Sequence, residues 1–344
     1  MQQSISFATG AVKYVFQSSL EELSALCGDK RCVVITDKHI ASLYPNIAKA
    51  YNTLTIPAGE AQKNLTVISA LSEHLLEIGA DRNTILVGIG GGVITDLTGF
   101  LASIYMRGIE FGFVPTTLLA MADASVGGKN GVSIGLYKNI LGTIRQPSFI
   151  LYAPSFLKTL PDREWSNGFA EIIKYACIFD ACIFDELSER NIGFYKEHPD
   201  ELNKLVERCV EWKNKVVAED EKENGNRKLL NFGHTAGHAI EKLYNIPHGQ
   251  AVALGMIIAC MVSENAAGLD SNTKNKLRTL LQQYGLPVNI KLDVKQLMDI
   301  LKKDKKRNAG AIDYVVLEHI GKGAMRTLPF DVIERAITTY ASPH

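Results

Sequence analysis

Three histidines within fifteen residues have the clearest chemical potential in this chain. His234, His238 and His248 are three of its eight histidines and lie in the run NFGHTAGHAIEKLYNIPHG. On a helix, His234 and His238 would lie one turn apart on the same face. Two imidazoles on one face suit a zinc-like metal, with a third ligand from the following loop and a carboxylate from elsewhere. The same spacing also suits two half-buried polar side chains, and spacing alone does not decide between the two interpretations.

A glycine-rich segment, GIGGGVITDLTGF, offers a second candidate site. Gly90, Gly91 and Gly92 follow an apolar strand and precede a helix, so the backbone N–H groups there can approach a phosphate. The segment does not match the dinucleotide fingerprint GxGxxG, which would need glycine at Val93. Asp96, in the first turn of that helix, either caps the helix or accepts a hydrogen bond from a ligand hydroxyl.

Further polar residues follow predicted strands. Glu60 and Lys63 lie in PAGEAQK, and Thr116 and Thr117 lie in VPTTLLA. In an open α/β sheet, ligands bind beyond the carboxyl ends of the strands. We therefore expect these residues to converge on the glycine-rich turn and to bind a nucleotide cofactor with it.

The segment MADASVGGKNGVSIGLYKNILG is interpreted as a loop that carries charged and amide groups among five glycines. Such a loop is costly to order, and its donors suit phosphate or polyhydroxyl recognition, although a solvated surface loop is the alternative. Gly127 and Gly128 leave room for a ligand beside Lys129, which favours the functional interpretation. Its charged and amide residues are Asp123, Lys129, Asn130, Lys138 and Asn139.

Several charged residues further along are ambiguous. Glu171 and Lys174 are three apart in GFAEIIKYA, which fits an ion pair worth about 0.2–0.5 kcal/mol or a metal ligand beside an active-site cation. Arg227 and Asn231 precede the histidines with helical spacing, so Asn231 and His234 would point into one cavity. The basic run LKKDKKR (301–307) is typical of a solvated face, although one of its lysines could bind an anionic substrate.

The elements that must position these residues change in character along the chain. Strand-like runs at 32–37, 53–58, 84–90 and 111–117 alternate with helical patterns at 64–78 and from about 94. After a run at 149–154, helical spacing dominates over 166–187, 199–219, 235–243, 250–267 and 272–284, with one later strand-like run at 311–321 and a final helix from about 331. We therefore predict an α/β nucleotide-binding domain with a mostly parallel sheet at 1–155, and a mostly α-helical metal- and substrate-binding domain at 156–344.

Composition indicates an ordinary globular protein of the cytoplasm. Of 344 residues 46% are hydrophobic, and 37 basic side chains balance 37 acidic ones, so no global field favours nucleic acid. The N-terminus lacks the pattern of a signal peptide, and the longest apolar run, 251–262, is too short to span a bilayer. The six cysteines form no CxxC pair and are expected to be reduced and mostly buried: Cys27, Cys32, Cys177, Cys182, Cys209 and Cys260.

Taken together, the motifs GGGVITDLTGF, VPTTLLAMADASVGGK, KNILG, GFAEIIKY and LLNFGHTAGHAIE with PHGQAV closely resemble those of the sugar-phosphate cyclases, in order over residues 30–320. The resemblance implies a homodimeric lyase that uses NAD and a divalent metal, zinc or cobalt. The reaction it implies converts 3-deoxy-D-arabino-heptulosonate 7-phosphate to 3-dehydroquinate and phosphate, in the shikimate route to aromatic amino acids. NAD would be reduced and regenerated within each turnover.

The resemblance also implies a role for individual residues. The metal ligands would be Glu171, His234 and His248, so His238 would face the substrate phosphate instead. Arg107, in IYMRG, would reach across the dimer interface to the phosphate of the neighbouring subunit. NAD contacts would fall on Asp37, Glu60, Lys63, Gly91, Gly92, Val93, Asp96, Thr116, Thr117, Lys138 and Thr159. Substrate contacts would fall on Asp123, Lys129, Asn139, Lys174, Lys213, Arg227, Asn231, His238 and Lys306, with Lys305 as the rival of Lys306.

Two other enzyme classes fit parts of this pattern. A metal-dependent polyol dehydrogenase shares the two-domain plan and the helical metal site, but it releases reduced cofactor. A sister cyclase would act on a sugar phosphate without a carboxylate, against which Arg227 and the basic run count. Both remain alternatives to the implied reaction.

Overall fold

The computed structural model describes residues 2–135, 137–304 and 310–342. Two compact units make up the chain. Unit 1 comprises Met1–Pro161 and Pro199–Lys222, and unit 2 comprises Asp162–His198 and Glu223–His344. Helix α9 (Pro199–Glu219) thus groups with the N-terminal unit, since it packs against the segment 120–124 and strand β1.

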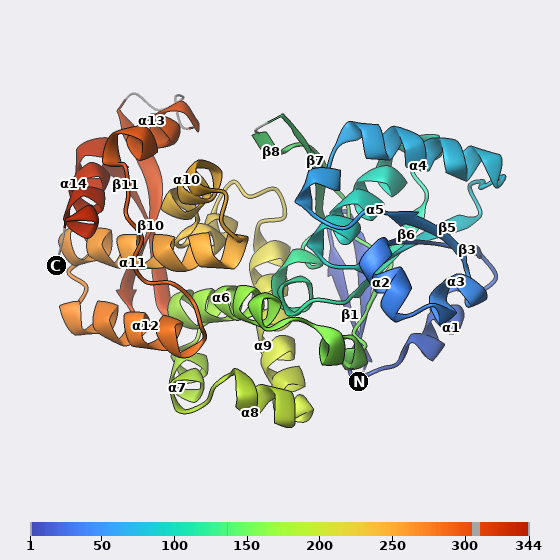
Figure 1. Ribbon diagram of the computed structural model, residues 1–344, viewed down its shortest axis with the longest axis horizontal. Helices are drawn as coiled ribbons and strands as arrows, with labels where there is room; N and C mark the ends of the chain where they lie inside the picture. The colour runs from blue at the N-terminus through green and yellow to red at the C-terminus, as the bar shows by residue number, and fades with distance from the viewer. Residues whose placement is uncertain (1, 136, 305–309, 343–344) are drawn as a thin grey trace. The chain divides into compact units, whose positions relative to one another are not determined.

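Unit 1 is built on a seven-stranded sheet (Figure 1). The strands are parallel except for the β1–β2 hairpin, which pairs in antiparallel fashion at one edge. A mostly parallel sheet was expected, and it is present. In spatial order the strands are β1 (Gln2–Phe7), β2 (Gly10–Val15), β9 (Phe149–Leu151), β6 (Glu110–Pro115), β5 (Thr84–Gly90), β3 (Arg31–Asp37) and β4 (Asn52–Ile56).

Helices cover both faces of this sheet. Ile85, Val87 and Ile89 of β5 belong to a core cluster with side chains of α1 (Leu23–Cys27), α2 (Lys38–Leu43) and α3 (Asn46–Ala50). The intervening residues of β5 face α5 (Gly92–Ile104) on the other side, where α4 (Leu65–Glu77) lies beside it. The fully buried β5 reads as a continuous apolar run for this reason.

Short helical turns complete unit 1. Most are single 3-10 turns between the larger elements, and the segment after β6 is a π-helical turn. They are η1 (Leu20–Glu22), η2 (Glu60–Gln62), η3 (Tyr105–Arg107), η4 (Ala120–Ala124, the π turn) and η5 (Pro154–Thr159).

Unit 2 is mostly helical and is organised around α11 (His248–Ala266). Contacts surround α11 with four helices and one strand of a β-hairpin. The other elements are α6 (Asp162–Ile178), α7 (Ala181–Glu189), α8 (Ile192–Glu197), η6 (Asn226–Asn231), α10 (His234–Tyr244), α12 (Ser271–Gln283), α13 (Val294–Asp304), β10 (Ala311–His319), β11 (Lys322–Pro329) and α14 (Phe330–Ala341).

The apolarity of α11 follows from its position in the core. Over its 19 residues it is long and apolar enough to cross a membrane, so the shorter span expected from the sequence, 251–262, underestimated it. However, 78% of its most apolar window is buried inside the protein. Burial of this kind is what a central core helix requires, and it accounts for the composition of α11.

Three sequence-based expectations about elements were wrong. The segment interpreted as a loop contains an antiparallel hairpin, β7 (Lys129–Ile134) and β8 (Tyr137–Ile144). The helix expected at 166–187 is two helices: the first ends at Ile178, and Asp180, with extended backbone, caps α7 through its side chain. The strands β1, β2 and β11 were not anticipated, since each is partly exposed and each includes polar or glycine residues that weaken the strand pattern.

Candidate metal and cofactor sites

Close backbone packing sets the position of His234. Helix α10 begins at His234 after Gly233, and it packs against α11. A Cβ atom on Gly255 of α11 would lie 1.9 Å from the carbonyl oxygen of Gly233. Only glycine permits this approach, so the first turn of α10 rests directly on the backbone of α11.

A second close approach sets the position of His248. This histidine is the first residue of α11, preceded by Pro247, and not part of a loop as first expected. A Cβ atom on the next residue, Gly249, would lie 2.6 Å from the Cα of Asn167 on α6. Because Glu171 follows Asn167 by four residues on that helix, it lies one turn away on the same face. The approach therefore brings His248 to Glu171.

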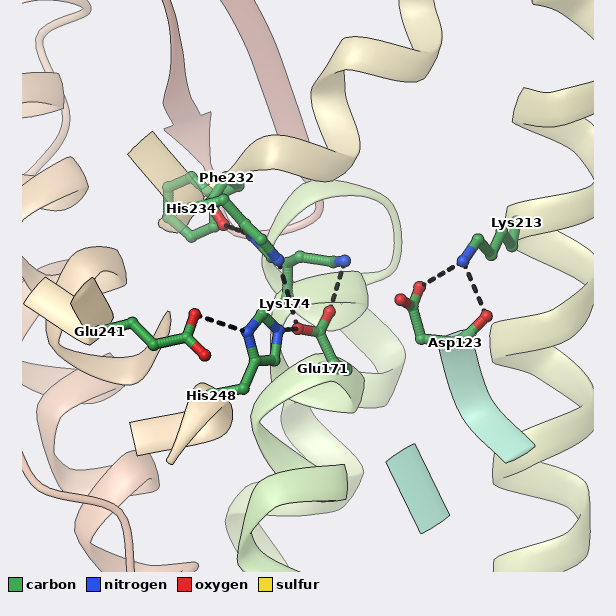
Figure 2. Close-up of polar contacts among 8 residues, drawn as sticks. All are labelled: Asp123, Glu171, Lys174, Lys213, Phe232, His234, Glu241 and His248. Atoms are coloured by element: carbon green, nitrogen blue, oxygen red, sulfur yellow. Dashed lines mark hydrogen bonds and ion pairs between the residues drawn. The ribbon is translucent and has the colours of Figure 1, made fainter. Parts of the chain in front are cut away.

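Glu171, His234 and His248 converge at one point (Figure 2). Nε2 of His234 lies 3.4 Å from Oε1 of Glu171, and Nε2 of His248 lies 3.1 Å from the same oxygen. Zinc–ligand bonds of about 2.0–2.1 Å in a tetrahedron would separate neighbouring ligand atoms by about 3.3 Å. Two imidazoles and one carboxylate with these spacings fit a divalent ion, with one coordination position left for a substrate.

Charged neighbours control the ionisation of this cluster. Glu171 is buried on α6, and its Oε2 forms an ion pair of 2.5 Å with Nζ of Lys174. Burial opposes ionisation of Glu171, but the charge of Lys174 and the hydrogen bonds from the histidines outweigh it and hold the pKa of this carboxyl well below its usual range. The cluster therefore provides an ionised carboxylate for a cation.

Glu241 lies on the opposite side of His248 from Glu171. Its Oε2 is 3.3 Å from Nδ1 of His248, as Figure 2 shows. Burial disfavours the charged imidazole, yet hydrogen bonds to Glu171 and Glu241 raise the pKa of His248 to about 9. A divalent ion binding through Nε2 would displace that ring proton. Sequence reasoning missed Glu241, although a carboxylate one turn after His238 on the same predicted helix was the available indication.

The other residues predicted near the histidines take different positions. Asn231 and His234 do not share a helix, because Gly233 adopts a left-handed φ of 76° between η6 and α10. Asn231 donates to Oε1 of Glu223 at 3.0 Å. Arg227 is almost fully buried, whereas the His238 ring is exposed 5.1 Å from the ring of His234.

In unit 1, the glycine-rich turn lies at the point where the strand order reverses. Strand β3 pairs with β4 on one side and with β5 on the other, so the carboxyl ends of β3 and β5 flank a topological switch point. Asp37 ends β3 and accepts hydrogen bonds from the first backbone amides of α2. Gly91 and Gly92 follow β5 and begin α5, with Val93 in its first turn. Backbone amides and a carboxylate thus meet at the edge where nucleotides bind.

Residues after β6 and η2 join this edge. Thr116 donates its backbone amide to the Gly90 carbonyl at 2.9 Å, and its buried Oγ1 has no hydrogen-bond partner within the described residues. The side chain of Thr117 packs on Gly91. Lys63 and Asp96 form a largely buried ion pair. Burial raises the pKa of Asp96, although the positive charge of Lys63 acts to lower it. An unpaired buried hydroxyl beside free helix-terminal amides fits a polar cofactor.

The remaining predicted residues that the structure describes lie in unit 1. In unit 1, Nζ of Lys213 on α9 lies 2.9 Å from Oδ1 of Asp123 and 2.7 Å from its carbonyl oxygen (Figure 2). Lys138 lies 3.9 Å from Glu60. Lys129 and Asn139 are exposed on the β7–β8 hairpin, and Arg107 lies in η3. Thr159 shares a 2.9 Å hydrogen bond with Tyr44. Lys305 and Lys306 lie outside the described residues.

Comparison with known proteins identifies the family of the chain. Family models described as the N-terminal and C-terminal parts of 3-dehydroquinate synthase match residues 53–167 and 168–307. A 3-dehydroquinate synthase of Pyrococcus furiosus is 39% identical over 93% of this chain and 96% of its own length. The chain belongs to the 3-dehydroquinate synthase family. A family member from Leptospira interrogans is also 39% identical, over 88% of this chain and 86% of its own length.

Solved structures of related cyclases share the whole fold of the family. A 2-deoxy-scyllo-inosose synthase in complex with carbaglucose-6-phosphate, NAD+ and Co2+ superposes with a TM-score of 0.89, at 25% identity, over 99% of this chain and 100% of its own. A 2-epi-5-epi-valiolone synthase from Streptomyces hygroscopicus, with NAD+ and Zn2+ bound, gives 0.88 at 27% identity and covers 98% of both chains. The fold class expected from the sequence is confirmed. A protein of Sinorhizobium meliloti described as a probable glycerol dehydrogenase, at 16% identity and a TM-score of 0.67, shares the fold alone.

Proposed function

We propose that the chain converts 3-deoxy-D-arabino-heptulosonate 7-phosphate to 3-dehydroquinate and inorganic phosphate, as an NAD- and metal-dependent lyase. The observation that carries this proposal is the convergence of Glu171, His234 and His248, in a chain that belongs to the 3-dehydroquinate synthase family. The glycine-rich turn at the switch point of unit 1 supplies the place for the nucleotide.

Glu171, His234 and His248 would hold the divalent ion, zinc or cobalt. When bound, such an ion acts as a Lewis acid on substrate hydroxyls and lowers the cost of removing their protons. Glu171 contributes the negative charge, kept ionised by Lys174. Glu241 fixes the orientation of the His248 ring through Nδ1, which would leave Nε2 to bind the ion.

The glycine-rich edge of unit 1 would hold NAD, which accepts a hydride from the substrate and returns it later in the same turnover. The amides of Gly91, Gly92 and Val93 would bind the pyrophosphate at the N-terminus of α5. Asp37, at the end of β3, would accept hydrogen bonds from a ribose. The polar residues around this edge would complete the site: Glu60, Lys63, Asp96, Thr116, Thr117, Lys138 and Thr159.

Cationic and amide side chains would hold the substrate. Lys129, Asn139, His238 and Arg107, the last from the neighbouring subunit, would bind the phosphate, which acts as its own base during elimination. Arg227 and Lys306 would pair with the carboxylate, since the planar guanidinium suits bidentate contact. Asp123, Lys174, Lys213 and Asn231 would position the hydroxyl groups. Holding the substrate in one reactive geometry supplies much of the rate acceleration.

Release of inorganic phosphate from the heptulosonate phosphate tests the proposal. The purified protein should release phosphate when NAD and a divalent metal are both present, and chelation or omission of NAD should stop the release. Product should form without accumulation of NADH. A protein that releases no phosphate under these conditions does not have the proposed function.

The two enzyme classes that compete with this proposal give different results in the same assay. A polyol dehydrogenase of the shared fold would accumulate NADH in proportion to product. A sister cyclase would instead release phosphate from a sugar phosphate that has no carboxylate. Arg227, buried in η6, favours a carboxylate-bearing substrate over both.

We also propose that the protein is a homodimer that associates through the β7–β8 hairpin. Large apolar side chains are exposed there, which is unusual on a free surface. Tyr137 and Ile140 are each 61% exposed, and Ile134, Leu141 and Ile144 add to the patch. Exposed Met106 and Arg107 in η3 have positive φ values of 48° and 67°. Light scattering on the purified protein tests the proposal, which a monomer would contradict.

A further inference from the structure

A gap in the surface of α5 receives one side chain from the β7–β8 hairpin. Gly99, in the middle of α5, has no Cβ, and a Cβ built there would lie 1.9 Å from Oδ1 and 2.4 Å from Cγ of Asn130. Asn130 is 4% exposed and is the second residue of β7. The amide group of Asn130 therefore occupies the volume that any other residue at position 99 would fill.

Inside this gap, the Asn130 amide joins the two ends of the hairpin. Its Nδ2 donates to the carbonyl oxygen of Gly128 at 2.8 Å and to that of Arg145 at 3.0 Å. The backbone amide of Arg145 also donates to the Gly128 carbonyl, at 2.8 Å. The Gly128 carbonyl thus receives two hydrogen bonds, and both orient the peptide that leads into Lys129.

Further contacts fasten the same part of the hairpin to α5. Thr143, which pairs with Asn130 across the hairpin, forms a 3.0 Å hydrogen bond with Oγ of Ser103. Ser103 in turn donates to the carbonyl oxygen of Gly99 at 2.6 Å. The guanidinium of Arg145 donates to the carbonyl oxygen of Ala102 at 3.0 Å. The base of the hairpin is therefore held to the helix that begins at the glycine-rich turn.

Lys129 is the exposed residue at the centre of this arrangement. It follows Gly127 and Gly128, which have left-handed φ values of 97° and 69°, and it precedes the buried Asn130. Two glycines in succession have wide conformational freedom, so the direction of the Lys129 side chain depends on what fixes the peptides on either side. The Asn130 amide is a buried side chain that does this, from one residue away.

We infer that Asn130 is a positioning residue that fixes Lys129 for the substrate phosphate, and that Gly99 is required because it leaves the room for Asn130. This inference rests on the proposed role of Lys129 in phosphate binding. Asn130 acts through the backbone of Gly128 and Lys129 and does not itself touch the substrate. The same contact couples the phosphate-binding lysine to α5, whose N-terminus forms the proposed NAD site.

A double-mutant cycle tests the inference on the NAD- and metal-loaded protein, with wild type, Gly99→Ala, Asn130→Ala and the double variant. Asn130→Ala should raise KM for the heptulosonate phosphate, and Ki for inorganic phosphate as a competitive inhibitor, on the order of 10- to 100-fold, because misplacement of a contact group by about 1 Å has effects of that size. The affinity for NAD should not change. Gly99→Ala should produce the same defect, since its methyl group would expel the Asn130 amide.

The double variant makes the coupling visible. Once residue 130 is alanine, the contacts at 1.9 and 2.4 Å are removed and only its Cβ remains, 3.1 Å from a methyl group at residue 99, so the double variant should be little worse in KM or Ki than Asn130→Ala alone. Thermal unfolding should show the same coupling. Gly99→Ala should lower the unfolding temperature of the wild type by more than that of Asn130→Ala, because the two closest contacts are then absent and alanine favours a helix over glycine.

Different failures have different meanings. If the wild type is active but Asn130→Ala keeps its KM and Ki, the positioning role is wrong and the proposed function stands. If kcat falls in proportion to the folded fraction while KM, Ki and NAD affinity keep their wild-type values, Asn130 has a structural role only. If the effects of the two substitutions add, the coupling is wrong. If the wild type releases no phosphate, the proposed function and the positioning role both fail, whereas the unfolding cycle still reports on the packing.

Discussion

The carboxylate of Glu241 lies 3.3 Å from Nδ1 of His248. His248 contacts Glu171 through its other ring nitrogen, so the ring is held between two carboxylates from different helices. A histidine that donates Nδ1–H to a carboxylate presents the Nε2 lone pair to a metal. The contact between Glu241 and His248 therefore selects the tautomer that can act as a ligand.

Replacing Glu241 with alanine should weaken metal binding without removing it. Loss of such an outer partner lowers metal affinity about 10- to 100-fold, because the ring loses both orientation and basicity. Competition of the protein with a fluorescent zinc chelator measures the change. Glu264→Gln is the matched control, since Glu264 is a half-buried carboxylate on α11 that pairs with Lys274 instead. An unchanged zinc affinity in Glu241→Ala would show that Glu241 does not support His248 as a metal ligand.

His238 and His248 should respond oppositely to alanine substitution. His248→Ala removes a proposed ligand, so the variant should no longer be stabilised by added zinc, which at 100 times Kd contributes about 2.7 kcal/mol to a protein that binds it. His238→Ala should keep that stabilisation and lose turnover on the order of 100-fold, because it is proposed to face the phosphate. Thermal unfolding with and without zinc, beside phosphate release, separates the two. The reverse pattern would exchange their roles.

The elements of unit 1 could be predicted where burial is complete. Strand β5 is buried along its whole length, and its apolar run TILVGIG indicated it directly. The β7–β8 hairpin could not be predicted, because it combines five glycines over its wider segment with exposed apolar residues on β8. Its pairing depends on contacts with α5, such as Asn130 in the gap at Gly99, which no local pattern reports.

The candidate metal site shows a similar division. Spacing drew attention to His234 and His238, since four residues make one turn of helix. The structure instead brings His234 and His248 to one carboxylate oxygen of Glu171, 77 residues before His248. That convergence depends on the tight packing at Gly249 and Gly255. Spacing along one helix carries no information about such contacts between helices.

The buried ion pair between Lys63 and Asp96 should be sensitive to removal of one partner. Lys63→Met leaves Asp96 largely buried without its cation, which costs about 3–5 kcal/mol of unfolding free energy for pairs of this kind. Adding Asp96→Asn should recover part of the loss, because no carboxylate is then left unpaired. Urea denaturation measures both. The exposed pair of Lys30 and Glu110 is the control, and Lys30→Met should cost less than about 1 kcal/mol. Equal losses in the two lysine variants would contradict the prediction.

Ile140→Lys should dissociate the proposed dimer. A charged side chain in the centre of an apolar interface would be desolvated without a partner, at a cost of several kcal/mol. Light scattering at micromolar concentration should then report a monomer, and phosphate release should fall, because Arg107 no longer reaches the neighbouring subunit. Leu76→Lys is the matched control, since Leu76 is an apolar residue of the same unit with 63% exposure, near the C-terminal end of α4, whereas the bridge between Asn64 and Ser133 joins the other end of that helix to the hairpin. If both variants keep the mass of the wild type, the hairpin is not the interface.

Gly249→Ala should damage the metal site from outside it. The new methyl group would lie 2.6 Å from Cα of Asn167, so α11 must shift away from α6 and take His248 with it. Overpacking of this kind costs about 1–3 kcal/mol of stability, and the shift should also lower zinc affinity, because His248 and Glu171 separate. Gly193→Ala, on the exposed face of α8, is the control. Its methyl group would lie 3.1 Å from Oδ1 of Asn191, at the end of an exposed side chain. Chemical denaturation and zinc competition on both variants check the prediction. A Gly249→Ala protein with the zinc affinity of the wild type would show that the close approach of α11 to α6 is not what holds His248 against Glu171.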